Sequence, residues 1–327
     1  MKTIRTTCPY CGVGCGVLAS VDDAGRVSVR GDDQHPANLG RLCVKGAALG
    51  ETTGLAGRLL APEVDGQKVT WPQALAETAS RLQQVIDQHG PQAVAFYASG
   101  QLLTEDYYAA NKLMKGFIGA ANIDTNSRLC MSSAVTGYKR AFGADVVPCS
   151  YEDVENSDLV VLVGSNAAWA HPVLYQRLTQ AKRDNPRLQI VAIDPRRTAT
   201  CEIADRHLAL APGSDGGLFV GLLNALAQAG ACVDGFRDGA QALAEASGWD
   251  VAKVADFCGL AADEVAGFYR DFIAAPRAIT LYTMGINQSA SGSDKCNAII
   301  NVHLASGKYG RRGCGPFSLT GQPNAMG

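Results

Sequence analysis

The chain has 327 residues and a mass of 34.3 kDa, which suggests about two domains. Apolar residues make up 47% of it and charged residues 18%, a balance that excludes intrinsic disorder. The net charge of −2 gives no basic field for a nucleic acid or a membrane surface, and no apolar run reaches the roughly 18 residues of a membrane span. The composition therefore predicts a soluble globular protein.

The chain contains eleven cysteines, an odd number in a protein too long to need a disulfide scaffold. The first eight residues lack the apolar segment of a secretory signal peptide. Two arginine pairs, at 196–197 and 311–312, lie too far along the chain to act as a twin-arginine export signal. These features predict a reducing, cytoplasmic setting.

Short and Gly-rich elements fill the first 57 residues, with a β-hairpin expected at 16–21 and 26–30. A helix is predicted from Pro72 to His89, where apolar residues recur at helical spacing. Further apolar runs predict buried parallel strands that alternate with helices, at 93–97, 159–163, 188–193 and 278–282. We therefore expect an α/β fold, with a small β-rich domain over 1–57 and a doubly wound, Rossmann-like parallel sheet within 58–327. Ligands are expected at the carboxyl ends of its strands.

The most specific motif is a loop with three cysteines, Cys8, Cys11 and Cys15, followed by Cys43. Four thiolates can hold a cubic iron–sulfur cluster, and the intervening glycines at 12, 14 and 16 would let backbone N–H groups approach it and take positive φ. A structural zinc site is an alternative, although zinc favours paired Cys-x2-Cys knuckles. A dinucleotide-binding glycine loop is disfavoured by the spacing and by the lack of a following helix. The sequence thus favours a 4Fe-4S cluster.

The whole pattern resembles the N-terminal half of molybdenum enzymes that carry two molybdopterin guanine dinucleotides. Taken alone, Lys45 is a solvated charge and Cys130 a buried free cysteine. In that family, however, the lysine after the last cluster cysteine lies between cluster and pterin, so the resemblance implies an electron-transfer role for Lys45. Residues 126–135 resemble the segment that supplies a protein ligand to molybdenum, which implies Cys130 as that ligand.

The resemblance also implies a set of pterin-binding residues. Gln101 and Asn126 match positions that line the pterin and the substrate funnel, and Met284, Gln288 and Gln322 match further positions near the active site. Three strand ends match the nucleotide-binding segments: Gly164, Ser165 and Asn166; Asp194, Pro195, Arg196, Arg197 and Thr198; and Gly213, Ser214 and Asp215. A carboxylate there can accept the N–H donors of guanine, and arginines can neutralise the diphosphate.

The residue after Cys130 discriminates within the family. Formate dehydrogenases of the cysteine type have histidine there, which suits proton abstraction, whereas Met131 and its neighbours are similar to assimilatory nitrate reductases. The resemblance therefore implies a cytoplasmic enzyme that reduces nitrate to nitrite by oxygen-atom transfer. Its electron donor would be ferredoxin, flavodoxin or an NADH-dependent partner.

Some alternatives stay open. Arg128 is the candidate cation for nitrate, and a structural ion pair is its other interpretation. Formate oxidation, another molybdopterin reaction, and a non-catalytic electron-transfer subunit are the alternative functions. The six other cysteines are expected to be small buried hydrophobic residues: Cys149, Cys201, Cys232, Cys258, Cys296 and Cys314.

Family members continue beyond the Gly-rich segment at 317–327 into a domain that covers the pterins. We therefore expect a fragment whose C-terminal part is missing. With much of the cofactor's buried shell absent, this chain by itself should hold the cluster but little molybdenum.

Overall fold

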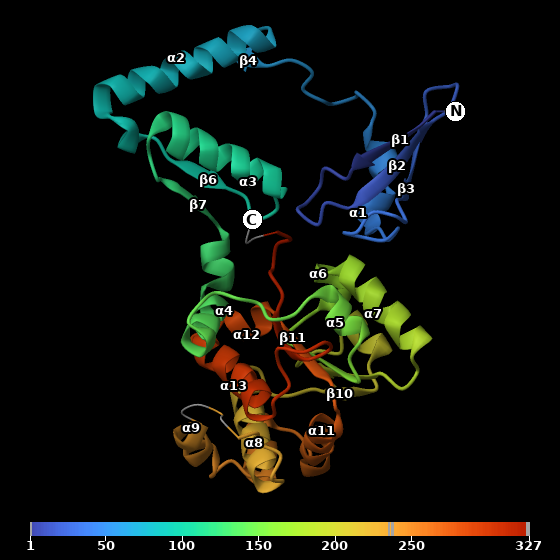
Figure 1. The fold of residues 1–327 in the computed structure, drawn as a ribbon. Helices are drawn as coiled ribbons and strands as arrows, with labels where there is room; N and C mark the ends of the chain where they lie inside the picture. The colour runs from blue at the N-terminus through green and yellow to red at the C-terminus, as the bar shows by residue number, and fades with distance from the viewer. Residues whose placement is uncertain (1, 235, 237–238, 325–327) are drawn as a thin grey trace. The chain divides into compact units, whose positions relative to one another are not determined.

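The computed structural model describes residues 2–234, 236 and 239–324, with only the backbone of Arg128. The chain forms two compact units (Figure 1): unit 1 comprises residues 1–128 and 322–327, and unit 2 comprises residues 129–321. The division between them falls within the first turn of helix α4 (Ser127–Phe142).

Unit 1 begins with a three-stranded antiparallel sheet in the order β1-β2-β3. The predicted hairpin is confirmed as β2 (Gly16–Val21) and β3 (Val27–Gly31). Strand β1 (Lys2–Thr7) was not predicted, because its residues are all exposed and show no apolar alternation. The next elements along the chain are α1 (Val44–Ala47), the 3-10 turn η1 (Leu49–Thr52), and a separate two-stranded sheet of β4 (Glu63–Val64) and β5 (Gln67–Lys68).

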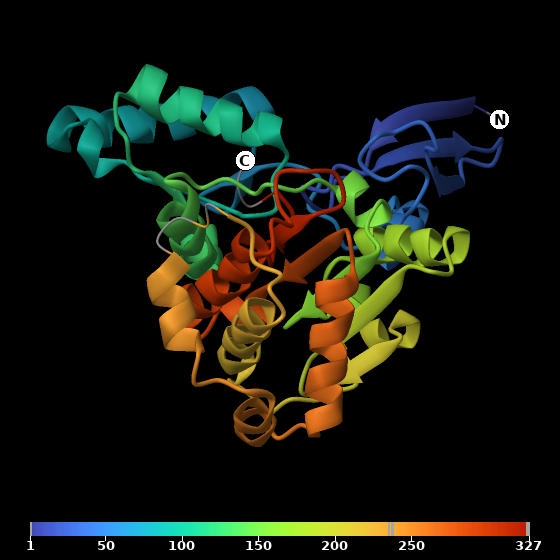
Figure 2. The ribbon, with the colours of Figure 1, turned by 60° about the horizontal axis from the view of Figure 1, so that its bottom comes forward.

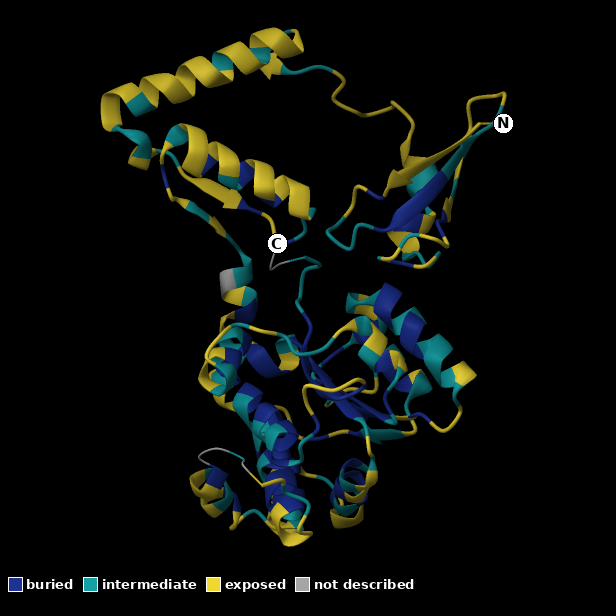
Figure 3. Cartoon of the chain, in the orientation of Figure 1, coloured by how far each residue is buried: buried dark blue, intermediate teal, exposed yellow. Residues whose placement is uncertain are grey.

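The predicted helix is confirmed as α2 (Trp71–His89). It begins with a capping box, in which Thr70 N–H donates to Gln73 Oε1 at 2.9 Å and Gln73 N–H donates to Thr70 Oγ1. No residue of α2 is buried in this structure, and Figure 3 shows the helix as a largely exposed rod. Its apolar stripe therefore lacks a partner among the described residues.

The predicted strand at 93–97 corresponds to β6 (Phe96–Ala98), which pairs in parallel with β7 (Ile123–Thr125). The expectation that it is buried is wrong, because Phe96 is 38% and Tyr97 72% exposed. The reason is that β6 lies in a separate two-stranded sheet and not in the main sheet. The neighbouring elements are the 3-10 turn η2 (Pro91–Ala93), α3 (Thr104–Asn111) and the π-helical segment η3 (Lys112–Ile118).

Unit 2 is built on a five-stranded parallel sheet in the order β10-β9-β8-β11-β12. Its strands are β8 (Leu159–Val163), β9 (Gln189–Ile193), β10 (Arg206–Leu208), β11 (Ala278–Tyr282) and β12 (Gly315–Ser318). Counted from β8, this order is 3-2-1-4-5, that of dinucleotide-binding folds. The predicted Rossmann-like sheet is therefore confirmed, while β12 was missed because Gly315 and Pro316 weaken its strand signal.

Alternating residues of the strands feed two hydrophobic cores, one on each face of the sheet (Figure 2). Leu159, Val161 and Val163 pack on the face covered by α4, α8, α11 and α13, whereas Val160 and Leu162 pack on the face covered by α5 and α7. The helices of unit 2 after α4 are α5 (Tyr151–Glu155), α6 (Ala167–Ala170), α7 (Pro172–Asp184), α8 (Asp215–Gln228), α9 (Gly239–Ala246), α10 (Val251–Cys258), α11 (Ala262–Ala274), α12 (Met284–Asn287) and α13 (Gly292–Ala305). A 3-10 turn, η4 (Ala199–Ile203), precedes β10.

All eleven cysteines are free thiols. Of the six predicted to be buried, Cys149 and Cys232 are only half-buried, whereas the other four are buried as expected. In the described part of the chain, no helix is both long enough and apolar enough to cross a membrane.

Candidate cofactor sites

The three-cysteine loop of unit 1 is closed by backbone hydrogen bonds. Cys8 N–H donates to Cys15 O at 2.9 Å, and Gly14 N–H donates to Cys11 O at 3.2 Å. Gly14 has the predicted positive φ of 63°. Gly12 and Gly16 do not, and Gly16 is required for close packing, since a Cβ there would lie 2.3 Å from Cγ of the His35 ring.

The buried side chain of Asn38 connects this loop to the segment that leads to Cys43. Its Oδ1 accepts from Gly16 N–H at 2.9 Å, and its Nδ2 donates to the carbonyls of Gly16 and Arg41. Asn38 thus links the three-cysteine loop to the segment before Cys43, and its amide nitrogen and oxygen are both hydrogen-bonded. The sequence analysis did not identify it, because a lone Asn in a loop carries no pattern.

The four cluster cysteines lie close enough to affect one another electrostatically. Burial, together with the neighbouring thiols of Cys11, Cys8 and Cys43, raises the pKa of Cys15 to about 12. Burial likewise raises the pKa of Cys8, while nearby Lys45 lowers it. Four crowded thiols are reluctant to ionise together, and a bound cation reverses that preference. The group therefore fits a metal cluster that binds thiolates.

No three or more His, Cys, Asp or Glu side chains of the described residues converge on a single-ion site. A 4Fe-4S cluster does not need such convergence, because its four irons each take one thiolate. Lys45 lies in α1, two residues after Cys43, with its side chain exposed and within electrostatic reach of Cys8.

Unit 1 also gathers two of the predicted pterin residues. Asn126 Nδ2 donates to Gln322 Oε1 at 2.5 Å, although the two residues are 196 positions apart. Asn126 Oδ1 accepts from Gly100 N–H at 3.0 Å, directly beside Gln101. The predicted residues Asn126 and Gln322 therefore meet beside Gly100, the residue that precedes Gln101.

In unit 2, the connections turn to opposite sides of the sheet between β8 and β11, which makes this the topological switch point where such folds bind ligands. The backbone after β8 touches the backbone after β11 here. Gly285 N–H donates to Gly164 O at 3.1 Å, and a Cβ on Gly285 would lie 2.5 Å from Gly164 Cα. Gly164 also has a φ of +55°. Glycine is required at both positions.

The other predicted strand-end residues follow their strands as expected. Asn166 Oδ1 accepts from Thr200 Oγ1 at 3.1 Å, and Asp194 Oδ1 accepts from Arg196 N–H at 2.9 Å. Pro195, Arg196 and Arg197 are exposed. Thr198, which closes this segment, is half-buried and precedes η4. Two of the predicted strand ends thus carry ordered polar turns, and their arginines are free to meet an anion.

The third strand end contains a buried ion pair. Gly213 has a φ of +92°, and Ser214 Oγ donates to Ala211 O at 2.7 Å. Asp215, predicted to bind guanine, starts α8, and its Oδ2 lies 2.8 Å from Lys295 Nζ of α13. Both side chains are nearly fully buried, at 7% and 6% exposure. The carboxylate is therefore oriented by a lysine that the sequence analysis did not single out.

Cys130 lies half-buried in the first turns of α4. Met131 next to it is only 3% exposed and packs in the hydrophobic core, so it is a core residue here. Thr283 Oγ1 donates to Met284 Sδ at 2.9 Å, while Gln288 is exposed. The Arg128 side chain, proposed to attract nitrate, lies outside the described residues, as do residues 325–327 of the final motif.

Four polar atoms at this edge are buried without a hydrogen-bond partner among the described residues: Ser165 Oγ, His171 Nδ1, Tyr282 OH and Asn287 Oδ1. Leaving a buried polar group unpaired costs free energy, which a ligand with N–H or O–H donors recovers. A pterin carries several N–H donors. The close glycine contact and these unpaired atoms therefore fit a bound molybdopterin, and the half-buried Cys130 offers a sulfur of the kind that a soft transition metal binds.

Known proteins resemble the chain along its whole length. A family model described as "Molybdopterin oxidoreductase Fe4S4 domain" matches residues 1–53, and one described as "Molybdopterin oxidoreductase" matches residues 58–326. The chain is 82% identical to a "Nitrate reductase" of Klebsiella oxytoca, covering all of this chain and 38% of that protein. It is 38% identical to a "Periplasmic nitrate reductase" of Desulfovibrio desulfuricans and 37% identical to an "Assimilatory nitrate reductase" of Haloferax mediterranei, covering 46% of each.

The solved structure of acetylene hydratase from Pelobacter acetylenicus shares the fold, with a TM-score of 0.73 and 21% identity over 93% of this chain and 43% of that one. The chain spans less than half the length of the relatives that it matches. Because the family model covers most of its residues, the chain belongs to the molybdopterin oxidoreductase family.

Proposed function

We propose that this chain is the cluster- and pterin-binding part of a nitrate reductase catalytic subunit. The observation that carries the proposal is the 82% identity, over every residue of the chain, to the Klebsiella oxytoca nitrate reductase. The support from the structure is that Asn287 and Gly321, which follow strands β11 and β12, contact Cys130, and that four thiols crowd together in unit 1.

Reduction of nitrate to nitrite takes up two electrons and two protons and releases one water. When bound, the molybdenum cofactor supplies a redox-active Lewis acid. Cys130 would ligate the metal through its thiolate, and Cys8, Cys11, Cys15 and Cys43 would hold the cluster that delivers electrons. The strand-end residues of unit 2 would hold the nucleotide end of the pterin.

Met131 supports nitrate over formate as the substrate. Its buried thioether has no basic group to take a proton from formate, and it packs in the core beside Asn287. Lys45, exposed next to the cluster cysteines, is our proposed residue on the electron path toward the pterin. Arg128 is our candidate for the charge of nitrate.

We further propose a cytoplasmic, assimilatory role with a ferredoxin, flavodoxin or NADH-dependent electron donor. The periplasmic and assimilatory relatives are similar to this chain to nearly the same degree. The support for a reducing compartment is the odd number of cysteines in a chain too long to need a disulfide scaffold.

The test replaces the matching 38% of the Klebsiella oxytoca protein with this chain. With a reduced viologen as donor, the chimera should form nitrite from nitrate, and Cys130→Ala should abolish nitrite while the electron paramagnetic signal of the cluster persists. Formate oxidation without nitrate reduction by the chimera would contradict the proposal. Nitrite formation by Cys130→Ala at the parental rate would remove Cys130 from the metal site.

A further inference from the structure

The thiol of Cys130 is covered by a short loop that follows β12. Gly321 in this loop lies so close that a Cβ on it would be 2.8 Å from Cys130 Sγ and 2.6 Å from Met284 Sδ. Any side chain at position 321 would therefore push the loop away from the sulfur. The position of this loop therefore determines how far the Cys130 thiol is covered.

Two hydrogen bonds fasten the loop. Leu319 N–H donates to Tyr282 O at 2.8 Å, which continues the pairing of β12 with β11. His171 Nε2 lies 2.6 Å from Thr320 O, the carbonyl directly before Gly321. Because a carbonyl only accepts, Nε2 must carry the proton and Nδ1 a lone pair. Burial lowers the pKa of His171, so the neutral form makes this bond.

A second side chain holds Cys130 through its backbone carbonyl. Asn287, at the end of α12, is 3% exposed, and its Nδ2 donates to Cys130 O at 2.5 Å. Asn287 is anchored in turn by its own N–H, which donates to Thr283 O at 3.1 Å. The carbonyl and the sulfur of Cys130 are thus held by elements that follow two different strands, β11 and β12.

We infer that His171 and Asn287 are positioning residues for Cys130: His171 holds the Gly321 loop against the sulfur, and Asn287 holds the backbone of Cys130. The inference rests on the proposed function in taking Cys130 as the thiolate of the metal. Partners of this kind orient a ligand before metal binds and tune its donor strength. Neither residue touches the substrate in this assignment.

The test measures thiol reactivity, which needs neither molybdenum nor nitrate. The 327-residue chain is alkylated with iodoacetamide, and mass spectrometry follows the tryptic peptide 129–139 that contains Cys130. Half-buried Cys232 in the same unit serves as the internal reference. The variants are His171→Phe, which keeps a ring but loses the donor, and His171→Gln, which keeps an N–H donor. Asn287→Leu keeps the approximate size but cannot donate.

Alkylation of Cys130 should accelerate at least threefold in His171→Phe and in Asn287→Leu, with Cys232 unchanged. His171→Gln should react at a rate near that of the parent. An unchanged Cys130 rate in His171→Phe or in Asn287→Leu would overturn the assignment for that residue. A parallel rise at Cys232 would show general loosening of the unit, and equal rates in His171→Gln and His171→Phe would show that the hydrogen bond is irrelevant. Either result would also overturn the inference.

Discussion

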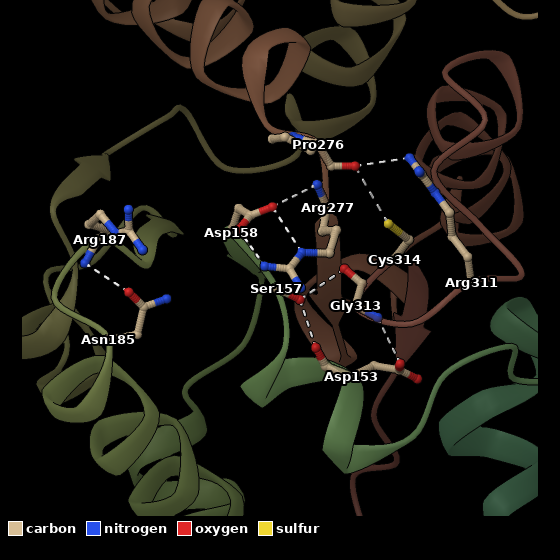
Figure 4. A network of polar contacts seen from close by, with 10 residues as sticks. All are labelled: Asp153, Ser157, Asp158, Asn185, Arg187, Pro276, Arg277, Arg311, Gly313 and Cys314. Carbon is tan, nitrogen blue, oxygen red and sulfur yellow. Dashed lines mark hydrogen bonds and ion pairs between the residues drawn. The ribbon is translucent and has the colours of Figure 1, made fainter.

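The two edges of the parallel sheet in unit 2 differ in whether their polar groups are paired. At the amino ends of β8 and β11, the polar groups satisfy one another (Figure 4). Arg277 binds Asp158 through Nε at 3.0 Å and NH2 at 2.7 Å, and its backbone carbonyl accepts from Asp158 N–H at 2.9 Å. Asp153 Oδ1 accepts from Gly313 N–H at 2.8 Å, and Ser157 Oγ donates to Gly313 O at 3.0 Å. This edge is complete without a ligand.

At the carboxyl ends of the same strands, glycine backbones touch, and buried polar atoms lack partners. Gly164 and Gly285 leave no room for a side chain, and Ser165 Oγ, His171 Nδ1 and Asn287 Oδ1 are unpaired among the described residues. Stability that is given up at one edge of a fold commonly marks a functional site. We conclude that the amino edge fixes the strand register and that the carboxyl edge is adapted to bind a ligand.

The largest expected effect concerns the buried ion pair of Asp215 and Lys295 at the carboxyl edge. Lys295→Met leaves the Asp215 carboxylate buried without its partner, and breaking such a pair lowers the free energy of unfolding by about 3–5 kcal/mol. The matched control is Arg140→Met, which breaks the exposed Arg140–Asp294 pair to the same helix α13 and should cost less than about 1 kcal/mol. If urea unfolding gave the two variants equal losses in the free energy of unfolding, the Asp215–Lys295 pair would behave as a surface pair.

A smaller effect is expected from filling the glycine contact at the switch point. Gly285→Ala forces its Cβ toward Gly164, and overpacking of this kind costs about 1–3 kcal/mol. Gly248→Ala is the control, because its Cβ would meet only the flexible end of Lys253 at 3.9 Å, and it should stay within about 0.5 kcal/mol of the parent. Thermal unfolding compares the stability of the parent with that of Gly285→Ala and Gly248→Ala. A Gly285→Ala variant as stable as the parent would refute the close contact.

The smallest effect is expected at the amino edge, and it depends on pH. The Arg277 side chain holds the pKa of Asp158 below its usual 3.8. The pair therefore stabilises the fold above that value, and its contribution is lost as the pH falls through the lowered pKa. Arg277→Met should cost about 1 kcal/mol near neutral pH, because the pair is partly exposed, and less at about pH 3. A difference between parent and variant that is independent of pH would contradict this role.

Much of the sheet could be predicted from the sequence because its central strands are continuous apolar runs. Residues 159–163 and 278–282 are buried on both faces, and few other arrangements suit such runs. Strand β12 was missed because Gly315 and Pro316 dilute the pattern, and β6 was taken as buried because a run of apolar residues does not reveal how many neighbours its sheet has.

The candidate site was predictable where the motif is local, as in the three-cysteine loop. Pairings between distant residues were not predictable, since nothing in the local sequence distinguishes their members. Lys295 reaches Asp215 across 80 positions, and Asn287 reaches Cys130 across 157. Asn287 stands between Met284 and Gln288, which the resemblance had marked, but its role depends on a contact that only the fold creates.

The most direct test of the contrast between the edges is a calorimetric titration of this chain with GDP, which carries the guanine, ribose and diphosphate of the cofactor's nucleotide end. Saturable binding is expected, with ADP at least tenfold weaker, since a carboxylate pairs with the N1–H and N2–H donors that adenine lacks. Gly285→Ala at the carboxyl edge should raise the Kd for GDP at least tenfold, whereas Arg277→Met at the amino edge should leave it unchanged. Equal Kd values for GDP and ADP, or an equal increase in the Kd for GDP in the two variants, would contradict the assignment of the carboxyl edge as the nucleotide-binding edge.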